Sequence, residues 1–175
     1  ARLRTDPMTS DTATDDSADL APGWVRWRHD FHRFPETGFN EQRTSEQVAQ
    51  ILGLLGLEVH RGIGGTGVVA NLRVGSGRGT IGLRADMDAL AMTETASDRQ
   101  HASAHPGCMH ACGHDGHMAM LLGAAQLLSL RRDFDGTVRF IFQPAEEHGR
   151  GAAAMLADGL LERFPVDEIY GAHNI

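Results

Sequence analysis

The sequence is poor in cysteine and has no long apolar segment. Its 175 residues include two cysteines, Cys108 and Cys112, too few for a disulfide framework; metal binding or reactivity is favoured, with a single disulfide as the alternative. No apolar run approaches the ~20 residues of a membrane-spanning helix, and the N-terminus is not typical of a signal peptide. We therefore expect a cytoplasmic protein that does not insert into a membrane.

Clustered positive charge is also lacking. The formal net charge is −7 and there is no block of basic residues, which argues against nucleic acid or an anionic membrane surface as a partner. Residues 1–20 are polar and rich in Ser, Thr and Asp, so we predict that they are disordered. Residues 21–175 are enough for one domain with a sizeable core.

Hydrophobic periodicity and turn residues divide this domain into helices and strands. We predict a helix that starts at Trp24 and stops at Pro35, and a second helix with Asn40 as its N-cap and Gly56 at its end. Further helices are predicted over residues 117–132 and 149–161, a surface loop over 92–109, and strands over 57–63, 67–74, 79–86, 136–143 and 167–174. This order predicts an α/β fold with a mostly parallel sheet flanked by helices.

Acidic and histidine side chains follow three of the predicted strands. The strand at 79–86 leads into Asp86 and Asp88, the strand at 136–143 leads into Glu146 and Glu147, and the last strand leads into His173. The carboxyl ends of parallel strands meet at one edge of a sheet, which is where α/β proteins bind ligands. We therefore expect these side chains to lie close together.

The stretch "HPGCMHACGHDGH" adds soft and borderline ligands at the same edge. It places Cys112 and His114 directly before a helix, whereas Cys108 is taken as structural. Thiolate and imidazole suit Zn or another borderline divalent ion, and carboxylates extend the range to Mn. Of two adjacent carboxylates, one can bind metal while the other moves protons. A surface Glu pair alone is usually only solvated, so it is the combination that favours a metal site.

Five motifs in order carry a resemblance to a known family. They are "RHDFHRFPETGFNE", "GLRADMDAL", "MHACGHDGHMAMLLGAA", "FIFQPAEEHGRGAAAML" and "GAHN". The chain from about Trp24 onward resembles the N-terminal part of the M20 metallopeptidase family. The branch it resembles contains amidohydrolases of the hippurate hydrolase and auxin–amino-acid hydrolase type.

The resemblance implies a role for each matching residue. Glu146 matches the general base, and Asp88 matches a catalytic-site carboxylate beside the metal centre. The residues that match metal ligands are Cys112, His114, Glu147 and His173. Asp86 matches either a second carboxylate with the role of Asp88 or an outer metal ligand. His110 and His117 belong to the motif as supporting residues. The implied cofactors are two divalent ions, Mn or Zn, with Co or Ni as alternatives.

The activity implied by the resemblance is hydrolysis of the amide bond of small N-acyl or N-aroyl amino acids. Residues 21–175 would form a partial zinc-peptidase-like catalytic domain without its lid or dimerisation domain, through which the whole protein would form a homodimer. The resemblance therefore predicts that this truncated chain has little activity alone. The alternatives are an M20-type dipeptidase or aminopeptidase, and a non-catalytic metal-binding or redox module around Cys112.

Overall fold

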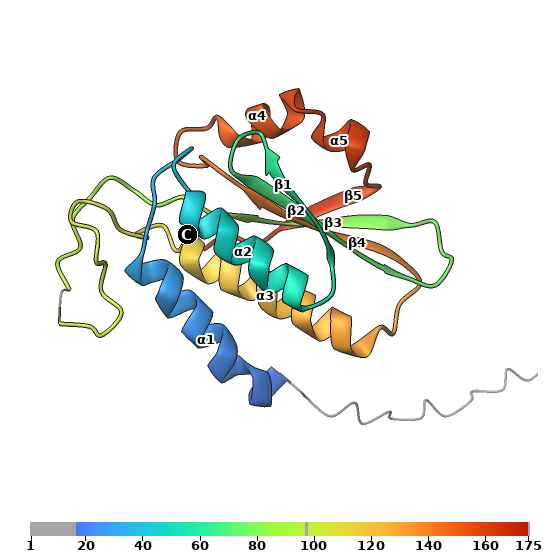
Figure 1. The fold of residues 1–175 in the computed structure, drawn as a ribbon, viewed down its shortest axis with the longest axis horizontal. Helices are drawn as coiled ribbons and strands as arrows, with labels where there is room; N and C mark the ends of the chain where they lie inside the picture. Colours follow the sequence, from blue (N-terminus) through green and yellow to red (C-terminus); the bar gives the residue numbers. More distant parts are fainter. Residues whose placement is uncertain (1–16, 97, 175) are drawn as a thin grey trace, which may run out of the picture.

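One sheet with helices on both faces forms the described part of the chain. The computed structural model describes residues 17–96 and 98–174. In chain order the elements are α1 (Ser17–Arg33), α2 (Gln42–Leu54), β1 (Glu58–Ile63), β2 (Gly67–Val74), β3 (Thr80–Asp86), α3 (His114–Arg131), β4 (Gly136–Gln143), α4 (Gly151–Ala157), α5 (Leu160–Arg163) and β5 (Glu168–Gly171). Helices α1, α2 and α3 lie on one side of the sheet, and α4 and α5 lie on the other (Figure 1).

The sheet is mixed, with the strand order β1-β2-β4-β3-β5. Strand β3 pairs in parallel with β4 and β5, whereas β2 pairs antiparallel with β1 and β4. Strand β2 is reversed because a short turn joins it to β1 as a hairpin. The other four strands run in the same direction, which confirms the predicted α/β class and its mostly parallel sheet.

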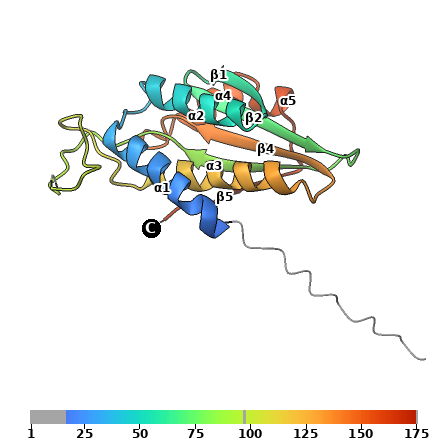
Figure 2. The ribbon, with the colours of Figure 1, turned by 60° about the horizontal axis from the view of Figure 1, so that its bottom comes forward.

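The larger part of the core lies between the sheet and the helices α1, α2 and α3. Helix α3 buries Met118 and Leu122 against Phe140 and Phe142 of β4. A smaller cluster on the opposite face includes Met155 of α4. Helix α1 lies along α3, outside the sheet (Figure 2). Burial of both faces of β4 fixes the carboxyl end of this strand in place.

Helix α1 begins earlier than its apolar periodicity predicts. It starts at Ser17, so residues 17–20 of the segment predicted to be disordered are helical, and residues 1–16 lie outside the described residues. Asp19 in the first turn stabilises the helix dipole. The Nε1 atom of Trp24 donates a 2.7 Å hydrogen bond to Oε1 of Gln126 in α3. Helix α1 thus packs against α3, and its first turn lies in a polar segment that has no apolar periodicity.

The N-terminus of α2 is capped from outside the helix. The prediction of Asn40 as the N-cap was wrong, because its side chain bonds to the preceding loop instead. The N-cap position is Glu41, whose side chain makes no capping bond. The carboxylate of Glu36 accepts hydrogen bonds from the backbone N–H groups of Arg43 and Thr44, at 3.2 and 2.8 Å. A side chain of the preceding loop thus takes the place of a local cap.

Two other helix boundaries differ from the prediction. Helix α3 begins at His114 rather than at residue 117, after Gly113 with a φ of 85°. The helix predicted over 149–161 is two helices, because the chain turns at Gly159 with a φ of 78°. Among the described residues, no helix combines the length and apolar character needed to cross a lipid bilayer.

Candidate metal centre

The predicted polar side chains converge at one edge of the sheet. Strands β3, β4 and β5 are parallel, so their carboxyl ends meet where α3 begins. The structure brings together Asp86, Asp88, Cys112, His114, Glu146, Glu147 and His173. Segments separated by up to about 90 residues of sequence thus supply one cluster.

His114 lies at the centre of this cluster. Its side chain is fully buried, and Nδ1 lies 2.7 Å from the backbone carbonyl oxygen of Asp88. A carbonyl oxygen only accepts, so Nδ1 carries the proton, and Nε2 is the ring atom that a neutral His114 would offer to a cation. Nε2 has no hydrogen-bond partner within the described residues, and it lies 3.6 Å from Oδ2 of Asp86 and 3.7 Å from Oε1 of Glu147. A bound cation would satisfy both the lone pair and the carboxylates.

Two overlapping sets of donor atoms have the spacing of a metal site. The first set is Cys112, His114 and Glu147, and the second is Asp86, His114, His117 and His173. Within each set the donor atoms lie within 4.8 Å of one another. Two ligands that each lie about 2.0–2.3 Å from one Zn²⁺ are at most about 4.6 Å apart. The buried Oε1 atom of Glu147 also lacks a described hydrogen-bond partner. The residues present therefore fit divalent cations.

The cluster carries an excess of negative charge. Burial raises the pKa of the Cys112 thiol to about 11, and the Glu147 carboxylate adds to the rise. Burial acts to lower the pKa of His114, but its hydrogen bond with Asp88 and the charge of Asp86 outweigh burial and raise it. A divalent cation would neutralise this charge and convert the Cys112 thiol into a thiolate ligand.

Asp88 holds the turn that follows β4. Its Oδ1 and Oδ2 atoms accept the backbone N–H groups of Glu146 and Glu147, at 2.9 and 3.1 Å. Burial acts to raise the pKa of Asp88, but the hydrogen bonds from His114 and from the two N–H groups lower it overall. Both carboxylate oxygens are therefore engaged in positioning the turn, and Asp88 belongs to neither donor set.

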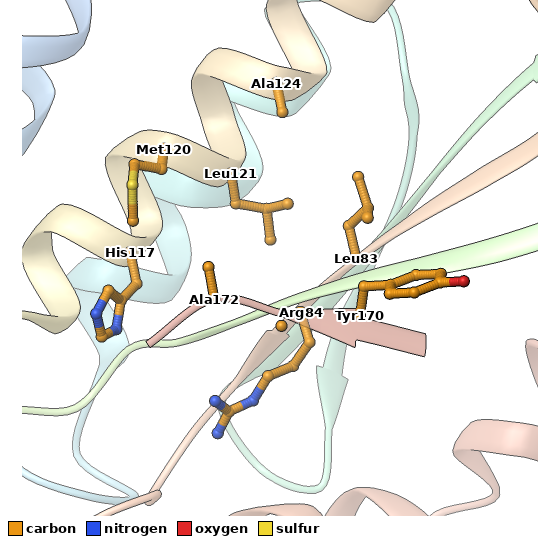
Figure 3. Close-up of a pocket in the computed structure, with 9 residues that line it drawn as sticks. Leu83, Arg84, His117, Met120, Leu121, Ala124, Tyr170 and Ala172 are labelled. Carbon is orange, nitrogen blue, oxygen red and sulfur yellow. The ribbon is translucent and has the colours of Figure 1, made fainter. Parts of the chain in front are cut away.

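Both ring nitrogens of His117 are engaged. Nδ1 lies 2.7 Å from Oδ1 of Asp86, whose Oδ2 accepts a 2.8 Å hydrogen bond from Arg84. Nε2 contacts the side chain and the backbone N–H of Asn174, the residue after His173. Beside His117 a largely apolar cavity of about 300 Å³ lies between α3 and β5 (Figure 3). His117 thus links α3 to the segment that carries His173.

His110 lies close enough to His114 and Asp88 to feel their charges, but it belongs to neither donor set. It is buried, and neither ring nitrogen has a described hydrogen-bond partner. Burial lowers the pKa of His110 to about 4, so the ring is neutral at pH 7. The two cysteines are free thiols, which leaves the alternative of a Cys108–Cys112 disulfide without support.

Sequence reasoning missed two residues that contact the cluster or its supporting turn. Asn174 holds His117, and Glu41 accepts the backbone N–H of Ala145 at 2.8 Å. Asn174 falls within the motif "GAHN" and Glu41 within "RHDFHRFPETGFNE", and these motifs were the only sequence features that could have identified the two residues. Their partners lie far away in sequence, so no local pattern identifies either role.

A layered α/β fold with histidine, cysteine and carboxylate donors at the ends of parallel strands defines the class of metallopeptidase-type catalytic domains. Within that class the chain belongs to peptidase family M20/M25/M40, whose family model matches residues 82–175. The matched range contains every candidate site residue from Asp86 to His173. The resemblance to the M20 family is confirmed.

The chain is similar to named relatives and to a solved structure of the family. The hippurate hydrolase of Campylobacter jejuni is 46% identical over 157 residues, covering 90% of this chain and 40% of that protein. Thermostable carboxypeptidase 2 of Saccharolobus solfataricus is 46% identical over 153 residues, covering 85% and 38%. The solved structure is that of the YXEP protein of Bacillus subtilis, described as a dinuclear metal binding peptidase from the M20 family. It matches this chain with a TM-score of 0.84 and 39% identity, covering 90% of this chain and 44% of that chain. The chain thus spans about two fifths of the length of these curated relatives.

Proposed function

We propose that this chain is part of a metal-dependent amidohydrolase that cleaves the amide bond of small N-acyl or N-aroyl amino acids. The names of two relatives support this substrate class. Hippurate is an aroyl group joined by an amide to glycine, and a carboxypeptidase removes the last residue of a peptide. Both substrates have a scissile amide followed by an amino acid with a free carboxylate.

The unequal environments of two adjacent carboxylates carry the proposal. The Glu147 side chain is 16% exposed and directs a buried, unpartnered oxygen toward Nε2 of His114. The Glu146 side chain is 35% exposed, and its Oε2 lies 3.7 Å from the same nitrogen. The buried carboxylate suits a metal ligand, whereas the exposed one can reach substrate and water. We therefore assign Glu147 as a ligand and Glu146 as the general base.

The proposed ligands are Cys112, His114, Glu147 and His173. Cys112, His114 and Glu147 form one donor set, and His173 shares the other set with His114. These two sets and the dinuclear metal binding of the related YXEP protein support two divalent ions, Zn or Mn, with Co or Ni as alternatives. When bound, such ions supply Lewis acidity to the carbonyl of the substrate and to water. Thiolate, imidazole and carboxylate together match the preferences of these ions.

The residues of the chain move the protons and hold the geometry. Glu146 accepts a proton from the attacking water and donates it to the leaving amine. Asp88 fixes the backbone of Glu146 and the tautomer of His114 through the contacts described above. A base held at its backbone and free at its carboxylate can keep one position while it takes up and releases a proton.

The test compares Glu146→Gln with Glu147→Gln as a matched pair. Each variant is made in the 175-residue chain and in the product of the full reading frame that encodes it. Bound Zn and Mn are measured by mass spectrometry, and hydrolysis of hippurate is measured by release of glycine. We expect Glu146→Gln to retain its metal and lose at least about 100-fold in turnover, the scale of general-base catalysis. We expect Glu147→Gln to lose metal as well.

The same assay separates the alternatives. Cleavage of dipeptides with a free amino terminus, but not of hippurate, would favour an M20-type dipeptidase or aminopeptidase. Full metal binding in both variants without turnover of any amide would favour a metal-binding or redox module around Cys112. Retained turnover in Glu146→Gln would refute the role of Glu146.

A further inference from the structure

The turn that carries Glu146 and Glu147 has an unfavourable backbone conformation. Ala145 is fully buried and has a φ of 46°, in the left-handed region that residues with a side chain rarely adopt. The backbone at Gly38 packs closely against this turn, because a Cβ atom added to Gly38 would lie 3.0 Å from Cα of Ala145. Such a conformation persists only when the surrounding structure holds it.

Three consecutive N–H groups of this turn are held by two buried carboxylates. Asp88 accepts the N–H groups of Glu146 and Glu147, whereas Oε1 of Glu41 accepts the N–H of Ala145 at 2.8 Å. Asp88 comes from the loop after β3, and Glu41 comes from the start of α2, 104 residues before Ala145. The turn is therefore fixed from two independent elements.

Burial of the Glu41 carboxylate costs free energy, and no contact with its own helix α2 accounts for it. Its side chain is fully buried, and within the described residues no basic side chain forms an ion pair with it. Its other side-chain contact is a 2.6 Å hydrogen bond from Oγ1 of Thr66. It does not cap α2, since Glu36 accepts the first N–H groups of that helix. A buried carboxylate is expensive unless its hydrogen bonds are strong, and hydrogen bonds to charged groups are the stronger ones.

We propose that Glu41 is a positioning residue for the base and the ligand of the metal centre. Its carboxylate holds the Ala145 N–H, which fixes the left-handed turn and thereby the directions of Glu146 and Glu147. This inference rests on the proposed function only where it concerns turnover; its structural part concerns the turn alone. Thr66 orients the carboxylate so that Oε1 faces the turn.

The first measurement needs no substitution. Amide hydrogen exchange of the unaltered chain reports the Ala145 N–H directly, with the Glu146 and Glu147 N–H groups as internal references. We expect all three to exchange slowly and to a similar degree. Fast exchange at Ala145 alone would overturn the proposal, whatever the chain catalyses.

The second measurement compares Glu41→Met with Glu41→Gln. Methionine keeps the volume but removes the acceptor, whereas glutamine keeps an oxygen that can accept the Ala145 N–H. The control is Glu36→Gln, which perturbs the same end of α2 without reaching the turn. Readouts are the Co²⁺ absorption spectrum and affinity of each variant, together with kcat and KM for hippurate in the product of the full reading frame.

We expect Glu41→Met to lower kcat and Co²⁺ affinity by roughly 10- to 100-fold, the range for residues that orient metal-site groups, with KM nearly unchanged. Glu41→Gln should restore most of both, and Glu36→Gln should change neither. Equal losses in Glu36→Gln and Glu41→Met would overturn the proposal in favour of a general role in folding. If the unaltered protein cleaves no amide, the proposed function fails, and the exchange rates and Co²⁺ spectra still decide the role of Glu41.

Discussion

Nδ1 of His32 lies 2.9 Å from Oδ2 of Asp115 in a buried contact between α1 and the first turn of α3. The opposite ring nitrogen lies 3.2 Å from Oε1 of Glu94, whose other oxygen accepts the N–H of Ser103 at 2.6 Å. His32 therefore ties the loop over 92–109 to the helix that begins with His114. The segment that carries Cys112 follows this loop, so the contacts of His32 help to hold that segment against α3.

This contact predicts a pH dependence of stability. The hydrogen bond to Asp115 raises the pKa of His32 against the opposing effect of burial, and Glu94 adds to the rise. A raised pKa in the folded state gives stability that is fully present below about pH 6.5 and lost as pH rises through the folded pKa. Arg28 and His101 also face this group, and burial lowers the pKa of His101.

The measurement is urea unfolding between about pH 6 and pH 9, with a chelator present so that metal binding stays constant. We expect the free energy of unfolding to fall across this range in the unaltered chain, and to fall less in His32→Gln. The pKa values of Asp115 and Glu94 are lowered overall, although burial opposes this, so their contribution is lost in acid instead. Parallel curves for the two proteins would contradict the role of His32.

Substitution of Asp88 should release the turn after β4. In Asp88→Asn one oxygen can still accept an N–H, but the amide group faces the other N–H group. We expect metal affinity to fall about 10- to 100-fold, and Asp88→Ala to cost about 1–3 kcal/mol of unfolding free energy because two part-buried N–H groups lose their acceptor. Competition with a chromogenic chelator measures the affinity. Asp98→Asn, at an exposed position, is the control and should leave it unchanged.

Metal removal should destabilise the protein through His114. A ligand at 100 times its dissociation constant adds about 2.7 kcal/mol of stability, which corresponds to a Tm shift of roughly 5–10 °C for a domain of this size. We expect EDTA to lower the Tm of the unaltered chain and to leave His114→Ala unchanged, because His114 belongs to both donor sets. An equal EDTA effect on both proteins would place the stabilising ion elsewhere.

Two glycines should respond in opposite directions to alanine. A Cβ atom at Gly53 in α2 meets nothing within 4 Å, so Gly53→Ala should stabilise the fold by about 0.5–1 kcal/mol. A Cβ atom at Gly151 would lie 1.5 Å from the carbonyl oxygen of Pro144, in the turn that carries Glu146. Gly151→Ala should therefore cost about 1–3 kcal/mol or more. Thermal unfolding measures both, and a stabilising Gly151→Ala would contradict the tight packing.

Much of the fold can be read from the sequence because its strands are short, apolar and bounded by glycine. The nearly continuous apolar run of β4, which is buried on both faces, and the apolar length of α3 place the sheet and its central helix. Boundaries set by distant contacts could not be read. Helix α1 starts within a polar segment that has no apolar periodicity, and the cap of α2 comes from Glu36, outside the helix.

The sequence by itself determined which chemistry is available at the metal centre. Carboxylate and histidine residues that follow strands of one parallel group meet at one edge, and Cys112 and His114 come where the next helix begins. The residue types available to a donor set can therefore be read from the sequence. Only the tertiary structure decided that the Glu147 side chain is less exposed than the Glu146 side chain. It also decided that Asp88 and Glu41 hold the turn. Hydrogen bonds between residues as far apart as Glu41 and Ala145 leave no local periodicity, because they depend on how separate elements pack rather than on the conformation of either one.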